Sequence, residues 1–288
     1  VRTMAVCLAC CLAVSPAAAK SRRVSGKLIQ TGGVVQLEGA GGGGFTPWAL
    51  ISGYGADHQV GANTHYTQIR LSDFRYESSG ARVGINDRVE LSFGEQRFYT
   101  EAAGTRLGLP SNFKLGQDIV GLKVRVFGDA VYYQDDWKPQ VSIGLQHKQA
   151  DQGVLLRALG ARDDEGTDFY VTATKVALED SLLWNATLRF TEGNQMGLLG
   201  FGGDKHDGLR AQFEGSLAYL PTRHTAVGVE YRSNPDNLLF ARQEGYKNIF
   251  CALFPSKHLS LTLAYVDLGS IATFAAQDGA YLSVQAGF

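Results

Sequence analysis

The chain closes with Gly279-Ala280-Tyr281-Leu282-Ser283-Val284-Gln285-Ala286-Gly287-Phe288, in which mainly apolar residues alternate with more polar ones. Such alternation predicts a β-strand with two different faces. A last strand that ends on an aromatic residue is typical of bacterial outer-membrane barrels, where it pairs with the first strand and turns its apolar face to lipid. A terminal Phe also resembles the signal for barrel insertion, so we expect the barrel-assembly machinery to bind this strand through Phe288.

The opposite end of the chain predicts export. Arg2 precedes an apolar run from Met4 to Val14, and Ala17-Ala18-Ala19 follow. A short positive region, a short apolar core and small residues form a secretory signal peptide. We expect residues 1–19 to be removed and residues 20–288 to form the barrel. A buried N-terminal helix and a lipoprotein signal at Cys10 are the alternatives.

Cysteine usage agrees with export. Three of the four cysteines, Cys7, Cys10 and Cys11, lie in the expected signal peptide. Cys251 alone remains in the expected mature chain, so no internal disulfide is predicted. It lies in an apolar run, where a small buried hydrophobe is the simplest interpretation.

Composition narrows the class of protein. After the expected signal peptide, no run approaches the roughly 20 apolar residues that a spanning helix needs. The net charge is −1, which offers no basic surface for nucleic acid. The 35 Gly and 12 Tyr suit tight turns and membrane-interface belts.

Several segments of about ten residues alternate in the same way, and the connections between them are alternately short and long. Short connections include Asn86-Asp87, Glu179-Asp180-Ser181 and Pro255-Ser256-Lys257, whereas residues 99–113 and 150–166 make long ones. Short periplasmic turns and long outer loops give this rhythm. We predict an all-β antiparallel transmembrane barrel of about 14 strands, with one strand at residues 48–55.

The start of the barrel leaves two alternatives. The stretch from Lys27 to Leu37 supplies the first strand if there are 14 strands, so residues 20–46 then hold that strand and a Gly-rich inward loop. If this region is instead a plug or an irregular arm, the barrel has 12 strands. The sequence does not decide between a strand and a plug.

A glycine run could occupy the lumen. Residues 39–44 lack the Gly-Lys-Ser/Thr ending of a phosphate-binding loop, and a strand rather than a helix is expected next. A flexible loop or a segment that crosses the lumen is the better interpretation. We hypothesise that Gly41, Gly42, Gly43 and Gly44 fold inward and constrict a pore.

Strand parity turns several charged side chains inward. The predicted lumen-lining and solute-contacting residues are Arg88, Glu90, Lys123, Arg125, Lys148, Arg189, Arg210, Glu214, Glu230 and Arg232. Seven are cations and three are acids, and rings of one sign select against solutes of that sign. A weak anion preference follows as a hypothesis, and cross-strand ion pairs that merely fill the lumen are the alternative.

Metal and catalytic signals are weak. Asp163, Asp164, Glu165 and Asp168 lie on an expected outer loop and offer the oxygen ligands that hard cations favour, but their spacing does not match a calcium-binding loop. A solvated loop is the better interpretation, so no metal and no cofactor are predicted. His258 and Ser260 share one strand face, which leaves a membrane-face hydrolase as a remote alternative to a non-enzyme.

The chain resembles a family of uncharacterised proteobacterial outer-membrane β-barrel proteins, catalogued as a domain of unknown function. The resemblance rests on segments that cover most of the mature chain, including residues 38–44 with Pro47-Trp48-Ala49-Leu50, residues 87–93, 160–170 and 198–204, Glu230-Tyr231-Arg232-Ser233, and residues 257–267. It implies an outer-membrane location and a barrel fold. It implies no activity, and no functional residue can be carried over from it.

Together these patterns predict a porin-like barrel in the outer membrane of a Gram-negative bacterium. We expect a passive channel or small-solute transporter with a weak anion preference. The alternative is a structural or lipid-interacting barrel with a filled lumen, and a barrel enzyme comes third. The expected partners are outer-membrane lipid and lipopolysaccharide, and neither the solute nor the oligomeric state follows from the sequence.

Overall fold

The protein is a closed antiparallel barrel of 12 strands. The computed structural model describes residues 27–32, 34–56 and 58–288, so the expected signal peptide lies outside the described residues. Each strand pairs with its neighbours in sequence, and β1 pairs with β12 to close the barrel. The strands are β1 (Val60–Leu71), β2 (Arg75–Ile85), β3 (Val89–Tyr99), β4 (Lys114–Phe127), β5 (Gln140–Ala150), β6 (Glu165–Ala177), β7 (Leu182–Thr191), β8 (Arg210–Thr222), β9 (Thr225–Arg232), β10 (Tyr246–Ser256), β11 (Leu259–Asp267) and β12 (Asp278–Gly287).

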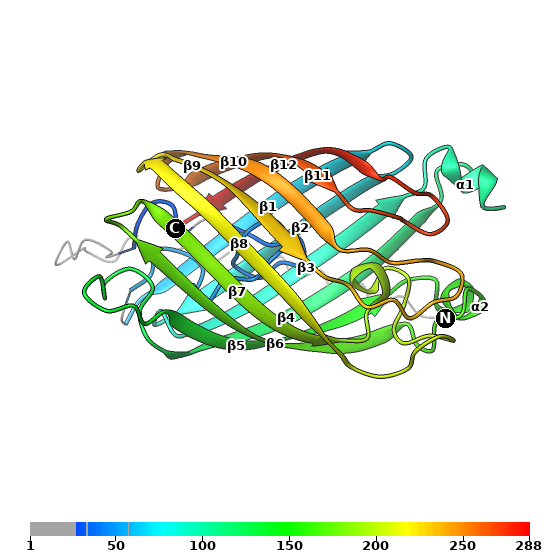
Figure 1. Cartoon of the computed structure of the whole chain (residues 1–288), viewed down its shortest axis with the longest axis horizontal. Coiled ribbons are helices and arrows are strands. Elements are labelled where there is room, and N and C mark those ends of the chain that lie inside the picture. The colour runs from blue at the N-terminus through cyan, green and yellow to red at the C-terminus, as the bar shows by residue number, and fades with distance from the viewer. Residues whose placement is uncertain (1–26, 33, 57) are drawn as a thin grey trace, which may run out of the picture.

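The expected number of 14 strands is wrong, and the alternative of 12 is confirmed. Residues 48–55 and the described residues from Lys27 to Leu37 form no strand of the barrel. Residues 34–52, which we call the plug, lie almost entirely buried inside the barrel instead. Figure 1 shows this dark-blue segment enclosed by the strands. A stretch surrounded by protein on every side has no lipid-facing side, so its apolar residues carry no period that marks a strand.

The two ends of the barrel differ. At the turn end lie mostly short connections and Phe288, whose backbone N–H donates to the Ala62 carbonyl at 2.9 Å; the β4–β5 connection, residues 128–139, is the long exception there. The loop end carries mostly long connections, apart from the β1–β2 loop at residues 72–74, with the short helices α1 (Ala103–Arg106) and α2 (Gly153–Ala158) and the 3₁₀ turn η1 (Asn194–Gly197). No helix within the described part of the chain is long and apolar enough to cross a membrane.

Period-two alternation places the strand residues on two surfaces. Large apolar side chains stay exposed on the outer surface of the wall, among them Leu91, Phe93, Val120, Ile143, Phe169, Leu188, Phe213, Leu217, Ile249, Leu263 and Leu282. Inward positions are buried and mostly polar at mid-height. Two buried apolar clusters lie above and below this polar zone, one at the loop end and one around Trp48 at the turn end.

Candidate functional site

The plug folds on itself within the lumen. Its backbone N–H groups at Gln36, Leu37 and Trp48 donate to the carbonyls of Ala40, Gly44 and Gly41 at 2.9–3.0 Å. Among the described residues, no backbone–backbone hydrogen bond joins residues 34–52 to a barrel strand. The plug is therefore not a thirteenth strand, and the wall's hydrogen-bond ladder is complete without it.

Side chains of the wall, rather than backbone groups of a neighbouring strand, hydrogen-bond to the plug backbone. The Glu90 carboxylate accepts hydrogen bonds from the N–H groups of Gly41 at 2.9 Å and Ser52 at 2.8 Å. The Lys123 ammonium donates to the carbonyls of Gly41 at 3.0 Å and Trp48 at 3.1 Å. Lys123 and Glu90 also pair with each other at 3.0 Å, and both side chains are fully buried. Burying backbone groups is costly unless they are hydrogen-bonded, so these contacts hold the plug in place.

Glu38 of the plug is the centre of a buried charge cluster. Its carboxylate pairs with Arg232 at 2.7 Å, with Lys148, and with Arg189 at 3.4 Å. Two wall carboxylates complete the set, since Asp168 contacts Lys148 at 2.7 Å and Arg189 at 3.0 Å, and Glu214 contacts Arg189. We call these six residues the central cluster: Glu38, Lys148, Asp168, Arg189, Glu214 and Arg232. It contains three cations and three carboxylates, and Glu38 is the member that the plug supplies.

The glycine run packs against this wall without space for side chains. A Cβ atom built at Gly43 would lie 1.8 Å from Oε1 of Glu230, and one at Gly41 would lie 2.4 Å from Oγ of Ser52. The Glu230 carboxylate accepts hydrogen bonds from the Phe45 N–H at 3.0 Å and from Nδ2 of Asn248 at 2.7 Å. Glycine is thus required here because wall carboxylates and the plug backbone approach closely.

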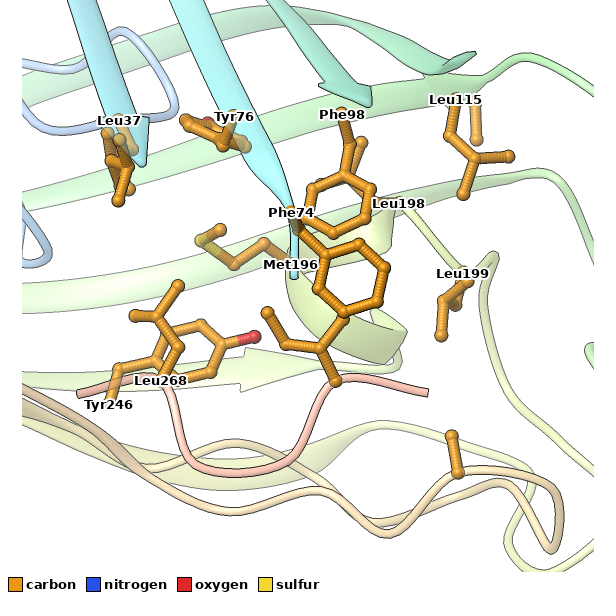
Figure 2. Packing of buried hydrophobic residues seen from close by; sticks show 14 of the residues in the cluster. Leu37, Phe74, Tyr76, Phe98, Leu115, Met196, Leu198, Leu199, Tyr246 and Leu268 are labelled. Atoms are coloured by element: carbon orange, nitrogen blue, oxygen red, sulfur yellow. The ribbon is translucent and has the colours of Figure 1, made fainter. Parts of the chain in front are cut away.

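The loop end of the lumen is apolar. Residues from β1–β4 and β10, from α2 and η1, and from the loops β1–β2, β3–β4, β7–β8, β9–β10 and β11–β12 surround a cavity of about 100 Å³. Figure 2 shows Phe74, Phe98, Met196, Leu198 and Tyr246 converging around this region. The Met196 side chain lines the cavity, while its carbonyl accepts hydrogen bonds from Nζ of Lys148 at 3.2 Å and Nε2 of Gln117 at 3.0 Å. Met196 thus connects the apolar cavity to the central cluster.

Most of the residues predicted to line the lumen lie inside it. Those that are buried are Glu90, Lys123, Lys148, Arg189, Glu214, Glu230 and Arg232. Arg125 is half-buried at the turn end and pairs with Asp87 and with Asp129, the latter at 2.8 Å. Arg88 and Arg210 are exposed at the turn end and the loop end respectively. Gly41–Gly44 lie within the lumen, where the sequence hypothesis of an inward loop placed them.

Four buried charged residues among those described escaped the sequence reasoning, and one of them, Lys175 of β6, donates to a carbonyl of the β4–β5 turn. Glu38 lies in the plug, which has no strand period. Arg82 of β2 is buried and donates to Oγ of Ser52 at 2.6 Å, and its apolar neighbours Ala81 and Val83 are the only local signal that could have placed it inward. Asp168, expected on an outer loop, lies inward on β6 instead.

The remaining candidates lie apart from the lumen. Asp163 and Asp164 of the β5–β6 loop pair with Arg157 at 3.6 and 2.6 Å. The Asp164 N–H donates to Asp163 at 2.8 Å and holds the pKa of that carboxyl below its usual value. Neither these acids nor Glu165 belongs to a metal-binding group, since the described residues contain no cluster of three or more His, Cys, Asp or Glu side chains that could hold a metal ion.

His258 and Ser260 do not form a catalytic pair in this structure. Nδ1 of His258 lies 2.7 Å from the Gly287 carbonyl, and the Ser260 hydroxyl donates to Gln285 at 3.0 Å. A general base must lie within hydrogen-bond reach of its nucleophile. Both side chains contact residues of β12 at hydrogen-bond distance instead.

Comparison with known proteins places the sequence in a family. Residues 31–285 match the family described as "Protein of unknown function (DUF3034)". No protein of the curated set matches the sequence.

Solved structures with a similar arrangement include two porins and an outer membrane phospholipase. A KdgM porin in complex with disordered oligogalacturonate has a TM-score of 0.49 and 9% identity, with 78% of this chain and 99% of that chain covered. A NanC porin has a TM-score of 0.48 and 9% identity, with 78% and 98% covered. Outer membrane phospholipase A from Escherichia coli has a TM-score of 0.45 and 9% identity, with 82% and 94% covered. Likenesses this distant add no argument about function.

Proposed function

This chain belongs to the DUF3034 family, and we propose that it is an outer-membrane barrel that passes small solutes when its plug leaves the lumen. A closed barrel leaves no unpaired strand edge, which suits a bilayer core that offers no hydrogen bonds. The outward band of exposed Leu, Ile, Val and Phe supports burial in lipid, because soluble proteins rarely expose apolar areas of this extent. A Gram-negative outer membrane and a signal peptide at residues 1–19 are parts of this proposal.

One observation carries the proposal of a transporter. The wall is hydrogen-bonded all the way round without the plug, and its mid-height lining is polar, with Gln96, Gln117, Gln146, Thr172, Thr187 and Ser216 among the buried inward residues. A barrel whose lumen faces water has such a lining. Withdrawal of the plug would therefore leave an intact barrel with a hydrophilic passage. The plug would act as a gate that is shut in the structure described above.

An anion preference follows for the opened state. Apart from Lys175, which donates to carbonyls of the β4–β5 turn, the buried cations of the wall are Arg82, Lys123, Lys148, Arg189 and Arg232. The buried carboxylates of the wall are Glu90, Asp168, Glu214 and Glu230. The wall thus has five of these cations against four carboxylates, and Glu38 balances the extra positive charge while the plug is in place. Its departure leaves one excess positive charge, which supports a weak preference for anions.

A second candidate is a structural barrel with a permanently filled lumen. The fit of the wall to the plug backbone favours it. The Ala49 carbonyl accepts from Gln140 and Ser142 at 2.6 Å each, and the Pro47 carbonyl accepts from Thr172 and Thr187 at 3.0 Å each. A barrel enzyme remains the third candidate, and the bonding of His258 and Ser260 to β12 gives it no support.

The proposed partners are outer-membrane lipid, lipopolysaccharide and the barrel-assembly machinery. At the turn end, Phe288 adds backbone contacts just past the end of β12, because its carbonyl accepts from the N–H groups of Tyr54 at 2.8 Å and Ala62 at 3.3 Å. Its exposed ring leaves it accessible to a partner during assembly.

Glu38→Gln separates the two main candidates. The substitution leaves Arg232 and Lys148 without their plug carboxylate, and loss of one partner of a buried pair costs about 3–5 kcal/mol. The cost falls on the plugged state, so at 1.4 kcal/mol per factor of ten we expect openings of single channels in a planar bilayer to become about 100- to 4,000-fold more frequent. Under a salt gradient, the reversal potential should have the sign of anion preference.

The matched control is Glu101→Gln. Glu101 is a half-exposed carboxylate on the β3–β4 loop that pairs with Arg75 at 2.9 Å, far from the plug contacts. It should leave the opening frequency unchanged. If Glu38→Gln is folded and inserted but never opens, the gate is refuted and the filled structural barrel is supported.

A further inference from the structure

The apolar cavity at the loop end has no role in closing the lumen by charge, and its lining differs from the polar zone at mid-height. It is lined by 19 residues, and none of them carries a charged side chain. We propose that this cavity is a binding site for a small neutral molecule built on a single aromatic ring. Binding there requires the folded barrel and does not depend on the proposed transport.

The position of the cavity supports a ligand rather than a simple core. Lipid contacts the outer surface of the barrel, so an apolar interior at the loop end gains nothing from the membrane. The cavity also reaches the surface of the loop end, because Leu107 and Leu109 of the β3–β4 loop line it and are half-exposed. Side chains that border an incompletely filled space lose van der Waals contacts, and a ligand in that space would supply these contacts.

The aromatic side chains favour a ring-shaped occupant. Phe74 packs on Phe98 with ring centroids 5.0 Å apart, and on Phe274 edge-to-face at 5.3 Å. Phe74 and Phe98 both line the cavity, and Figure 2 shows their rings side by side. Aromatic rings prefer tilted and edge-to-face partners at such spacings, so a further ring can extend this stack.

Size and charge narrow the ligand class. Apolar cavities of about 150 Å³ bind benzene. This cavity is about 100 Å³, and the flexible side chain of Met196 forms part of its lining. A thioether side chain adapts readily to the shape of its neighbours, so Met196 can fit around a ring. The small volume suits one ring rather than a long chain. A carboxylate would lose its hydration without a charged partner in the lining, so it should bind far more weakly than a neutral ring.

Fluorobenzene and 4-fluorobenzoate are suitable probes, because fluorine NMR separates a ligand bound to protein from one dissolved in lipid. The full mature chain in lipid nanodiscs should bind fluorobenzene saturably at one site, whereas empty nanodiscs should show partition alone. The charged analogue should bind at least 100-fold more weakly. Leu198→Trp, which fills the cavity, and Leu109→Trp, which crowds its edge, should each weaken fluorobenzene binding at least tenfold.

Leu217→Trp is the matched control, since Leu217 is exposed on the outer surface of β8. It should change binding less than twofold. Leu109→Trp keeps the test valid if Leu198→Trp does not fold, because Leu109 is half-exposed on a loop. Equal binding by the wild type and a folded filling variant, or 4-fluorobenzoate binding as tight as fluorobenzene binding, would overturn the proposal. Channel recordings are independent of both outcomes.

Discussion

Gly43→Ala should release the plug from the lumen. The new Cβ atom would lie 1.8 Å from Oε1 of Glu230 and 3.2 Å from Nε1 of Trp48, so the Glu230 carboxylate must move by more than 1 Å or the plug must lift. That carboxylate also accepts hydrogen bonds from the Phe45 N–H and from Asn248. Overpacking costs about 1–3 kcal/mol, and a hydrogen bond to a charged group contributes about 1.5–3 kcal/mol.

Crowding plus the loss of one such bond destabilises the plugged state by about 3 kcal/mol. At 1.4 kcal/mol per factor of ten, the fraction of molecules with a released plug rises about 100-fold. Amide hydrogen exchange of residues 36–48 in lipid nanodiscs reads this fraction directly, because exchange proceeds from the released state. We expect about 100-fold faster exchange in this segment and unchanged exchange in the strands.

Gly215→Ala is the matched control on β8. A Cβ atom there would meet no atom closer than 3.4 Å, which is ordinary contact. The variant should leave plug exchange at the wild-type rate. Exchange of residues 36–48 within threefold of the wild type in a folded Gly43→Ala variant would refute the claim that close packing on Glu230 holds the plug.

Two further predictions concern the wall. Lys123→Met leaves the buried Glu90 carboxylate without the cation at 3.0 Å, so the free energy of unfolding in urea should fall by about 3–5 kcal/mol. Adding Glu90→Gln should recover part of this loss. A loss below 1 kcal/mol would contradict the prediction. Trp137, 81% exposed on the β4–β5 turn beside the exposed Tyr132 and Tyr133, should lie at the membrane interface. Replacing Trp48 and Trp184 by Phe leaves Trp137 as the only tryptophan. Lipids brominated near the headgroup should then quench the Trp137 fluorescence more than lipids brominated near the bilayer centre. The absence of quenching would place this turn in water.

The wall of the barrel could be predicted from the sequence because its two faces have different surroundings. Outward positions carry exposed apolar side chains and inward positions carry buried, mostly polar ones, and this period of two made strands such as β11 and β12 recognisable. The connections followed the same logic, and Glu179–Ser181 and Asn86–Asp87 are short turns in the structure. Asp168 shows the limit, because its position near the start of β6 gave too little alternation on one side to extend the strand over it.

The plug could not be predicted in the same way. Its side chains contact the wall on every side, so Trp48, Ala49 and Ile51 are all buried and mimic a strand core. Which wall charges Glu38 meets depends on the closed barrel, since Lys148, Arg189 and Arg232 come from β5, β7 and β9. The expected excess of cations therefore had three sources: Arg88 and Arg210 are exposed and Arg125 pairs at the turn end, Asp168 was missed, and Glu38 of the plug adds one further carboxylate.

The apolar cavity was also beyond local pattern reading. Phe74 lies in the β1–β2 loop and Met196 in η1, and both loops fold over the lumen to meet Phe98 and Tyr246 of the wall. Loop residues carry no periodic mark of the surface that they contact. Their convergence depends on the closure of the whole barrel.

The resting conductance of the wild-type mature chain, folded and inserted in a planar bilayer, tests the gated barrel most directly. The account predicts a closed baseline interrupted by rare, brief openings that prefer anions. A steady open conductance in the wild type would contradict the plug as the closing element of the lumen.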